Sequence, residues 1–188
     1  PQTMKQSVSV PLLDLKAQHA CIKDEILAAV TEVIDSQHFI LGSTVSRFEE
    51  EAAAYCEVRH AIGCASGSDA IMLALLALDI GPGDEVICPS YTFFATGGYI
   101  AHVGAKPVFA EIDPATYNID PASVREIASR CIQLKAIMPV HLFGQCADMN
   151  ALLELSRELG VPLVEDAAQA IGSRDQSGQR AGSRGTMG

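Results

Sequence analysis

Short apolar runs alternate with helical patterns over most of this chain, and this alternation constrains the fold more than any other feature. The runs that predict strands span residues 61–64, 85–88, 106–112, 136–140 and 162–165. The helical patterns between and after them span about 70–78, 91–102, 121–130 and 148–160. Strands that are apolar throughout and separated by helices pair in parallel and are covered on both faces. We therefore predict an α/β fold built on a largely parallel sheet with helices on both faces.

The two ends of the chain depart from this alternation. Apolar residues recur at helical spacing between about residues 16 and 36, and a second helix is predicted from about 45 to 56. Residues 173–188 carry no strong apolar pattern and predict a loop. A domain that stops in a polar loop directly after an inner strand is incomplete. We therefore expect these residues to be the N-terminal part of a longer protein.

Charge and hydropathy exclude several classes of function. Thirteen Lys and Arg residues against twenty-three Asp and Glu residues give a net charge of −10, which argues against nucleic acid or an anionic membrane as the main partner. The longest apolar run, residues 70–78, is too short to span a bilayer. Residues 1–9 lack the apolar core of a signal peptide, so we expect a cytoplasmic protein. The six cysteines and five histidines are dispersed without metal-ligand spacing, so we expect no metal site.

Three motifs follow predicted strands, where open parallel sheets bind their ligands. The first, residues 66–69, reads Ser-Gly-Ser-Asp and opens a helix. A glycine lets the backbone approach a ligand, and a helix N-terminus offers free N–H groups to an anion, with the Ser68 hydroxyl as a further donor. The alternative is an ordinary strand-to-helix turn in which Ser68 or Asp69 caps its own helix.

The second motif, residues 89–96, places two adjacent aromatic residues shortly after a strand. Phe93 and Phe94 can stack on a flat ligand from this position. The alternative is that these rings belong to the hydrophobic core, and we expect this of one of the two.

The third motif, residues 164–169, is an apolar strand that ends in Glu165 and Asp166. A carboxylate at this depth needs a partner, which a cationic heterocycle nitrogen, a metal or an arginine can supply. The alternative is a cap in which Asp166 accepts hydrogen bonds from the N–H groups of a following helix. Together the motifs offer an anion-binding helix N-terminus, aromatic rings for stacking and a buried carboxylate. This combination fits a phosphorylated heterocycle with a basic ring nitrogen, and pyridoxal phosphate (PLP) meets that description.

Further stretches of the chain support this interpretation when they are taken together and in order. They lie at residues 11–16, 39–42, 67–70, 81–87, 89–93, 113–114, 117–120, 141–145 and 165–169. Over essentially its whole length, and in these stretches above all, the sequence resembles the DegT/StrS family of PLP-dependent sugar nucleotide aminotransferases. Each stretch alone is a weak signal, whereas the full set in this order is a specific one.

The resemblance implies roles for individual residues. Gly67 and Ser68 would bind the cofactor phosphate, and Phe93 would stack on the cofactor ring. Asp166 would form a salt bridge with the pyridine nitrogen, and Gln169 would lie near the ring hydroxyl. The implied cofactor is pyridoxal 5'-phosphate, and the implied substrates are a nucleotide sugar and an amino-acid donor such as glutamate. The implied architecture is a homodimer in which residues 1–188 form the N-terminal part of the PLP-binding large domain of a fold-type-I aminotransferase.

The lysines of this chain depart from the family pattern. The five lysines are Lys5, Lys16, Lys23, Lys106 and Lys135. The family's Schiff-base lysine would follow the glycine-rich segment that ends at Gly188, together with the rest of the large domain and a small C-terminal domain. Lys135 opens a predicted strand at the end opposite the site, so it is a poor substitute. We therefore expect no catalytic residue within these 188 residues and no activity from them alone.

Three other functions remain open from the sequence. A PLP-dependent sugar dehydratase of the same family replaces the lysine by histidine, and the residue that distinguishes the two lies outside this sequence. A non-catalytic regulatory protein can be built on the same fold. A cofactor-free α/β domain, in which all three motifs are structural, is the simplest alternative.

Overall fold

The computed structural model of the protein describes residues 10–11 and 13–188. Residues 1–9, on which the expectation of no signal peptide rests, lie outside the described residues, as does Lys5. The chain divides into two compact units, with the boundary between Arg47 and Phe48. In the described part of the chain, no helix has the length and apolar character needed to cross a membrane.

The first unit contains one long helix, α1, which spans Leu15–Ser36 as the periodicity predicts. Asp14 caps it, since the Asp14 carboxylate accepts a hydrogen bond of 3.0 Å from the N–H of Ala17. The helix ends where Gln37 adopts a left-handed conformation with φ of 58°. The second helix, α2, spans Ser43–Cys56 and crosses into the second unit.

The second unit is built on a parallel sheet. Its strands are β1 (Glu85–Pro89), β2 (Lys106–Ala110) and β3 (Leu134–Ile137), arranged in the order β2-β1-β3. Both pairings of β1 are parallel, and Ile87 lies opposite Val108 on one side and Ile137 on the other. The predicted α/β fold with a largely parallel sheet is confirmed.

A fourth extended segment continues the sheet beyond β3. Residues 163–166 form parallel bridges to β3 and to the residues after it, pairing Ile137 with Leu163 and Val140 with Asp166. Pro139 and Pro162 interrupt this ladder because proline has no N–H to donate, and both contribute only their carbonyls. This segment corresponds to the last predicted strand. Next to it, Met187 forms a further parallel bridge with Val164.

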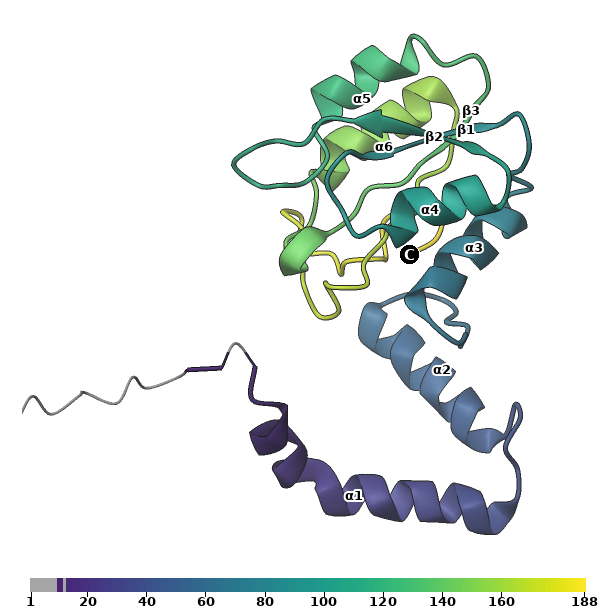
Figure 1. The fold of residues 1–188 in the computed structure, drawn as a ribbon, viewed down its shortest axis with the longest axis vertical. Helices are drawn as coiled ribbons and strands as arrows, with labels where there is room; N and C mark the ends of the chain where they lie inside the picture. Colours follow the sequence, from purple (N-terminus) through teal and green to yellow (C-terminus); the bar gives the residue numbers. More distant parts are fainter. Residues whose placement is uncertain (1–9, 12) are drawn as a thin grey trace, which may run out of the picture. The chain divides into compact units, whose positions relative to one another are not determined.

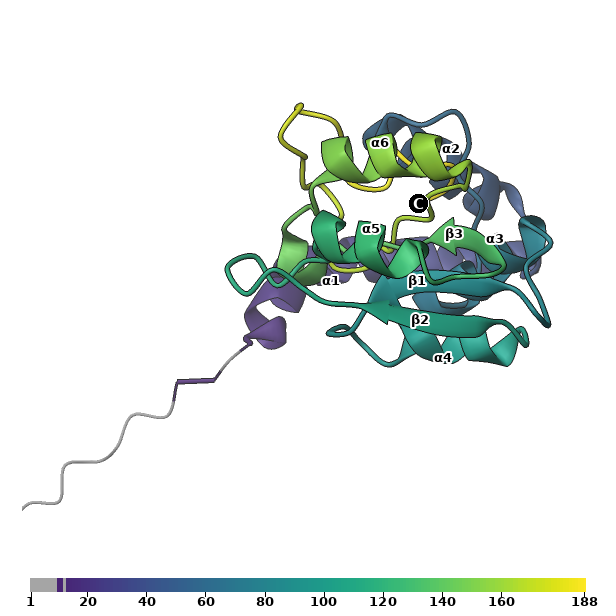
Figure 2. The ribbon, with the colours of Figure 1, turned by 90° about the horizontal axis from the view of Figure 1, so that it is seen from above.

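Helices cover both faces of the sheet (Figures 1 and 2). On one face lie α3 (Gly67–Ala77) and α4 (Ala95–His102), and on the other α5 (Pro121–Ala128) and α6 (Met149–Leu159). Successive strand residues point to opposite faces, so Val86 and Cys88 join the core under α3 and α4, whereas Ile87 joins the core under α5 and α6. Because the strands are parallel, their carboxyl ends lie at the same end of the sheet, which we call its carboxyl edge.

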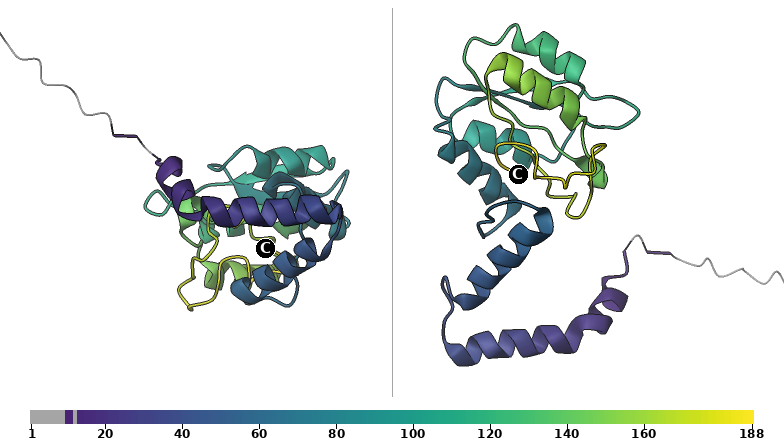
Figure 3. Two further views of the ribbon diagram at one scale, coloured as in Figure 1. Left: turned by 90° about the horizontal axis from the view of Figure 1, so that it is seen from below. Right: turned by 180° about the vertical axis from the view of Figure 1, so that it is seen from behind.

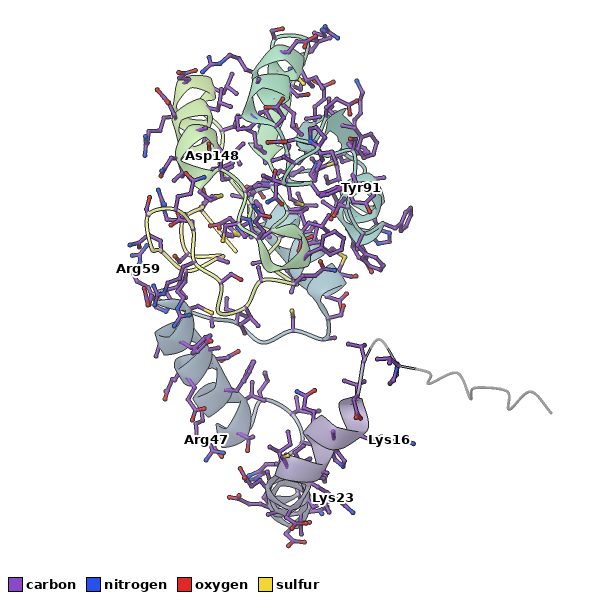
Figure 4. The ribbon with its side chains drawn as sticks, turned by 90° about the vertical axis from the view of Figure 1, so that its left-hand side faces the viewer. Lys16, Lys23, Arg47, Arg59, Tyr91 and Asp148 are labelled. Atoms are coloured by element: carbon purple, nitrogen blue, oxygen red, sulfur yellow. The ribbon has the colours of Figure 1, made fainter. Side chains whose placement is uncertain are left out.

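Cap residues begin and end the outer helices at the positions that the sequence predicts. The Asp120 carboxylate accepts from the N–H of Ala122, with Pro121 as the first helical residue of α5. Asp148, labelled in Figure 4, accepts from the N–H of Ala151 at the start of α6. Gly160 ends α6 in a left-handed conformation.

Two predicted elements differ from the structure. Residues 61–64 are not a strand, and Ile62 in this segment is 83% exposed. A strand needs a neighbouring backbone, and in residues 10–11 and 13–188 none pairs with this segment, where the Gly63 N–H instead donates to the Glu49 carboxylate. The helix predicted over 91–102 begins only at Ala95, because Ser90 extends the β1 ladder through a hydrogen bond to the Ala110 carbonyl and residues 91–94 form the bend.

A buried carboxylate closes the opposite, amino-terminal edge of the sheet. Glu85 forms a salt bridge of 2.8 Å with Lys106 and accepts hydrogen bonds from the N–H groups of Ile132 and Gln133. The bond from Lys106 and these backbone bonds lower the pKa of the Glu85 carboxyl from 4.5 to about 2. The ionised form of Glu85 therefore joins β1, β2 and the residues before β3.

Replacing Glu85 with glutamine is expected to lower the Tm at neutral pH, and this difference is expected to shrink as the pH falls to about 2. Because the folded-state pKa is depressed, the stabilisation is complete above the ordinary value of 4.5 and is lost as the pH falls towards about 2. Thermal unfolding of wild type and Glu85→Gln across this pH range measures the difference. Glu126→Gln, on the exposed surface of α5, is the control. A Tm difference as large at pH 2 as at neutral pH would contradict this assignment.

Candidate functional site

The three motifs meet at the carboxyl edge of the sheet. The Thr96 hydroxyl, in the second motif, donates a hydrogen bond of 3.0 Å to Asp166 Oδ2 in the third, seventy residues along the chain. A Cβ built on Gly67, in the first motif, would lie 3.8 Å from the Ala168 Cβ. Segments around residues 67, 96 and 166 are therefore neighbours in space. The topology of a parallel sheet predicts this for the second and third motifs, which follow strands.

The first motif forms the N-terminus of α3. Ser66 is the cap, since its hydroxyl accepts from the Asp69 N–H at 3.1 Å and donates to the Asp69 carboxylate at 2.9 Å. The alternative in which Ser68 or Asp69 caps the helix is therefore wrong. Within the described residues, the N–H groups of Gly67 and Ser68 have no acceptor, and the Ser68 hydroxyl has no partner. These donors are the ones that a helix N-terminus can offer to an anion.

The second motif is a bend whose aromatic rings are exposed. Phe93 is 70% exposed and Phe94 is 84% exposed. The expectation that one of them belongs to the core is wrong, because the buried positions of this segment are Ala95 and Thr96 instead. The Phe94 ring lies over α4, where a Cβ on Gly98 would come within 2.8 Å of it. Tyr91, labelled in Figure 4, pairs with Tyr117 at a ring separation of 5.9 Å.

The third motif holds Asp166 half-buried at the end of its strand. Asp166 Oδ2 accepts from Thr96, and Asp166 Oδ1 accepts from the Ala168 N–H at 3.2 Å. The second bond resembles a cap, but a turn follows rather than a helix, so the helix-cap alternative is wrong. In the described part of the chain, no lysine or arginine pairs with this carboxylate. A cationic partner is the group that it lacks.

Gln169 lies one turn further on and is exposed. Its side-chain oxygen accepts a hydrogen bond of 2.8 Å from the Phe143 N–H. Phe143 has a φ of 57° and Gly144 a φ of 88°, so this bond supports a left-handed turn after the third strand. Gln169 thus lies at the same edge as Asp166, with its amide nitrogen free of partners within the described residues.

A buried histidine–glutamate pair next to Asp166 was not predicted from the sequence. Glu165 and His141 are both fully buried at their side chains, and Glu165 Oε2 lies 2.8 Å from His141 Nε2. His141 Nδ1 accepts from the Ala147 N–H, so the ring proton lies on Nε2 and is donated to Glu165. The conjunction of a histidine and a glutamate at the ends of two adjacent apolar runs is the signal that could have revealed the pair.

Glu165 also orders the glycine-rich loop that follows the site. It accepts from the N–H groups of Gly182 at 3.0 Å, of Arg184 at 2.7 Å and of Gly185. Burial alone would raise the pKa of the Glu165 carboxyl, but His141 and these backbone N–H groups outweigh it and lower the pKa below 4.5. The predicted loop at residues 173–188, yellow in Figure 3, is confirmed. The buried Glu165 carboxylate holds this loop through the backbone N–H groups of its residues.

The lysines of the second unit lie at the other edge of the sheet. Lys106 is the first residue of β2 and pairs with Glu85, and Lys135 is the second residue of β3. Both lysines therefore lie at the opposite end of the sheet from Phe93, which follows the carboxyl end of β1, and from Asp166, at the end of its extended segment. The expectation that Lys135 lies away from the site agrees with this position.

Comparison with known proteins identifies the family. Residues 20–188 match the DegT/DnrJ/EryC1/StrS aminotransferase family. The chain belongs to this family. The family resemblance inferred from the motifs is therefore confirmed. This family is one of PLP-dependent aminotransferases.

Two similar proteins match nearly the whole of this chain. It is 50% identical over 179 residues to the pleiotropic regulatory protein of Geobacillus stearothermophilus, covering 95% of this chain and 47% of that protein. It is 45% identical over 185 residues to UDP-N-acetyl-3-dehydro-alpha-D-glucosamine 3-aminotransferase of Acidithiobacillus ferrooxidans, covering 98% and 49%. The chain spans about half the length of these curated relatives.

Solved structures of the family share the fold. The DesV structure from S. venezuelae, in complex with a ketimine intermediate, has a TM-score of 0.89 and 46% identity, covering 93% of this chain and 46% of that one. NtdA from Bacillus subtilis, with bound cofactor PMP, has a TM-score of 0.84 and 35% identity, covering 92% and 39%. The similarity thus extends over the sheet, its helices and the candidate site.

Proposed function

We propose that the complete protein is a PLP-dependent aminotransferase that moves an amino group, with glutamate as the donor, to a keto group of a nucleotide-linked sugar. The observation that carries this proposal is the Asp166 carboxylate, which lies half-buried at a strand end with neutral donors and, among residues 10–11 and 13–188, no cation beside it. Relatives named as nucleotide-sugar aminotransferases support the substrate class.

The residues at the carboxyl edge fit the cofactor. The N–H groups of Gly67 and Ser68, which have no acceptor in the described part of the chain, suit its phosphate together with the Ser68 hydroxyl. The exposed Phe93 ring suits stacking on a flat heterocycle, and Asp166 suits a protonated ring nitrogen. The Gln169 side chain, held by the Phe143 N–H, suits a position beside the ring hydroxyl. Bound PLP supplies an electron-withdrawing ring that stabilises negative charge on the substrate carbon.

The chain's own residues then have distinct tasks. Gly67 and Ser68 hold the anion, and Phe93 sets the plane of the ring. Asp166 keeps a proton on the ring nitrogen, because an ionised carboxylate stabilises a cation beside it. His141 holds the strand end that carries Asp166 twice: its ring Nε2–H donates to Glu165, and its backbone N–H donates to the Asp166 carbonyl at 2.9 Å.

We also propose that residues 1–188 are the N-terminal part of the PLP-binding large domain, and that they are inactive alone. In support, Lys106 and Lys135 of the second unit lie at the edge away from Asp166. Incubation of these residues with PLP, followed by borohydride reduction, is expected to yield no stable adduct at the site and no amino transfer. A site-specific adduct accompanied by amino transfer would overturn this proposal. We extend the proposal to a cytoplasmic homodimer, whose mass light scattering would measure.

The complete protein tests the proposed function directly. Purified with PLP, it is incubated with glutamate and a nucleotide-linked keto sugar, and 2-oxoglutarate and amino sugar are quantified. Equal formation of both products supports the proposal. Loss of water from the sugar without amino transfer would indicate a dehydratase instead.

A regulatory role is the second candidate, and one relative favours it. The pleiotropic regulatory protein of Geobacillus stearothermophilus is 50% identical to this chain over 179 residues. A regulatory protein on this fold is expected to bind PLP or a sugar nucleotide without turning either over. The assay of both products distinguishes the two candidates, because only an aminotransferase forms them.

Phe93→Ala is expected to weaken cofactor binding by about two- to tenfold, the contribution of a stacked aromatic pair. The free energy of unfolding should change by less than about 1 kcal/mol, because the ring is 70% exposed and leaves no cavity. Calorimetric titration with PLP and urea unfolding measure the two effects. Phe94→Ala, at an even more exposed ring on α4, is the control for binding. A collapsed fold in Phe93→Ala would show that Phe93 is a core residue.

A further inference from the structure

Thr96 lies at the junction between the second and third motifs. It is fully buried in the first turn of α4, and its hydroxyl oxygen lies 3.0 Å from Asp166 Oδ2. The same oxygen lies 3.2 Å from the hydroxyl oxygen of Thr92. Thr96 is therefore the middle member of a chain of three polar groups.

The chemistry of the three groups sets the direction of both hydrogen bonds. An ionised carboxylate only accepts hydrogen bonds, so the single hydroxyl proton of Thr96 is donated to Asp166. Thr96 can then only accept from Thr92, which becomes the outer donor. Hydrogen bonds aligned in one direction polarise and strengthen one another in a buried environment.

These hydrogen bonds connect the segment that carries Phe93 to the Asp166 carboxylate. Thr92 and Thr96 flank Phe93 on either side in the sequence, and the Thr96 N–H also donates to the Phe93 carbonyl at 3.2 Å. The backbone that carries Phe93 is thus tied through one buried hydroxyl to the strand end that carries Asp166.

The second oxygen of Asp166 is also held. Asp166 Oδ1 accepts from the Ala168 N–H at 3.2 Å, whereas Oδ2 accepts from Thr96 at 3.0 Å. A carboxylate with one donor on each oxygen has a fixed side-chain rotamer and still has lone pairs for a further partner.

We propose that Thr96 is a positioning residue, whose hydroxyl holds the Asp166 carboxylate and the Phe93 ring at the separation that a flat cationic heterocycle requires. This inference rests on the proposed function for the identity of that heterocycle. The contact between Thr96 and Asp166 itself is independent of any ligand.

The experiment compares Thr96→Val, which replaces the hydroxyl with a methyl group of similar size, with Thr96→Ser, which keeps the hydroxyl. Both are made in the complete protein. Calorimetric titration with pyridoxamine phosphate measures the Kd, and hydrogen exchange of the Ala168 amide in the ligand-free protein measures the order of the Asp166 rotamer. Thr31→Val is the matched control, because its hydroxyl bonds to the Leu27 carbonyl of its own helix.

Thr96→Val is expected to weaken binding roughly tenfold, as expected for the loss of one hydrogen bond to a charged group. The Ala168 amide should exchange several-fold faster in this variant. Thr96→Ser and Thr31→Val should match wild type in both measurements, and Thr92→Val, which removes only the outer donor, should lie between. If Thr96→Val does not fold, Thr92→Val and Thr96→Ser still test the order of effects.

The two measurements separate this inference from the proposed function. Failure of the wild-type protein to bind pyridoxamine phosphate would contradict the proposed function, while the exchange of the Ala168 amide would still report on Thr96. Wild-type exchange and wild-type binding in Thr96→Val would overturn the positioning role. Equal losses in Thr96→Val and Thr96→Ser would also overturn it, because they would show that packing rather than the hydroxyl matters.

Discussion

Asp166→Asn is expected to lower kcat of the complete protein by about 10²- to 10³-fold, the usual effect of removing one preorganised electrostatic partner of the reacting groups. An amide cannot hold a proton on the ring nitrogen, because it carries no negative charge. The cofactor should remain bound, since Gly67, Ser68 and Phe93 are unchanged. Steady-state kinetics of amino transfer measure kcat, and the absorbance of the purified protein measures its cofactor content.

The matched control for this variant is Asp148→Asn. Asp148 caps α6, on the face of the sheet covered by α5 and α6, and asparagine caps a helix as well as aspartate does. Its kcat should equal that of wild type. Unchanged turnover in Asp166→Asn would mean that another residue holds the ring nitrogen.

Glu165→Ala is expected to lower the free energy of unfolding by about 3 kcal/mol or more, the effect of removing one member of a buried hydrogen-bonded pair. The substitution leaves His141 buried without its acceptor and leaves three backbone N–H groups of the glycine-rich loop unsatisfied. Urea unfolding measures the loss. Glu158→Ala removes an exposed glutamate that pairs with Arg125 on the surface, and it should change stability little.

The stability supplied by Glu165 should also depend on pH. Its pKa is lowered below 4.5 in the folded protein, so the ionised form is stabilising above that value and its contribution is lost as the pH falls through the folded-state pKa. Glu165→Gln should therefore be destabilised relative to wild type at neutral pH, and the difference should shrink in acid. A loss of equal size at all pH values would show that the charge of Glu165 has no role.

Local features of this fold were predictable because short-range chemistry decides them. The caps at Asp120 and Asp148 and the glycine stop at Gly160 depend on a few neighbouring residues. The strand positions follow from apolar runs, and the alternation of Ile87 with Val86 and Cys88 between two cores follows from the period of a strand. The meeting of the second and third motifs at one end of the sheet follows from parallel topology.

Features that depend on a distant partner were not predictable in the same way. The apolar residues 61–64 have the composition of a strand, but no neighbouring backbone pairs with them in the part of the chain that the structure describes. Phe93 and Phe94 are of a residue type that is usually buried, but both are exposed. Ala95 and Thr96 occupy the buried positions instead, because a bend precedes α4 and the helix begins only at Ala95. Whether a side chain is buried depends on which element packs over it.

The alternation of apolar runs and helices by itself determined the parallel α/β fold, and the ordered motifs determined the family and the edge at which chemistry is expected. The resemblance to the family assigned a cofactor contact to Asp166, but only the tertiary structure showed what Glu165 beside it contacts. Successive residues of an extended segment point to opposite sides, so Glu165 turns inward to His141 and the glycine-rich loop, whereas Asp166 turns to Thr96 and the site edge. The residues next to Glu165 therefore could not reveal its structural role, because its partners, His141 and the glycine-rich loop, lie on other segments of the chain.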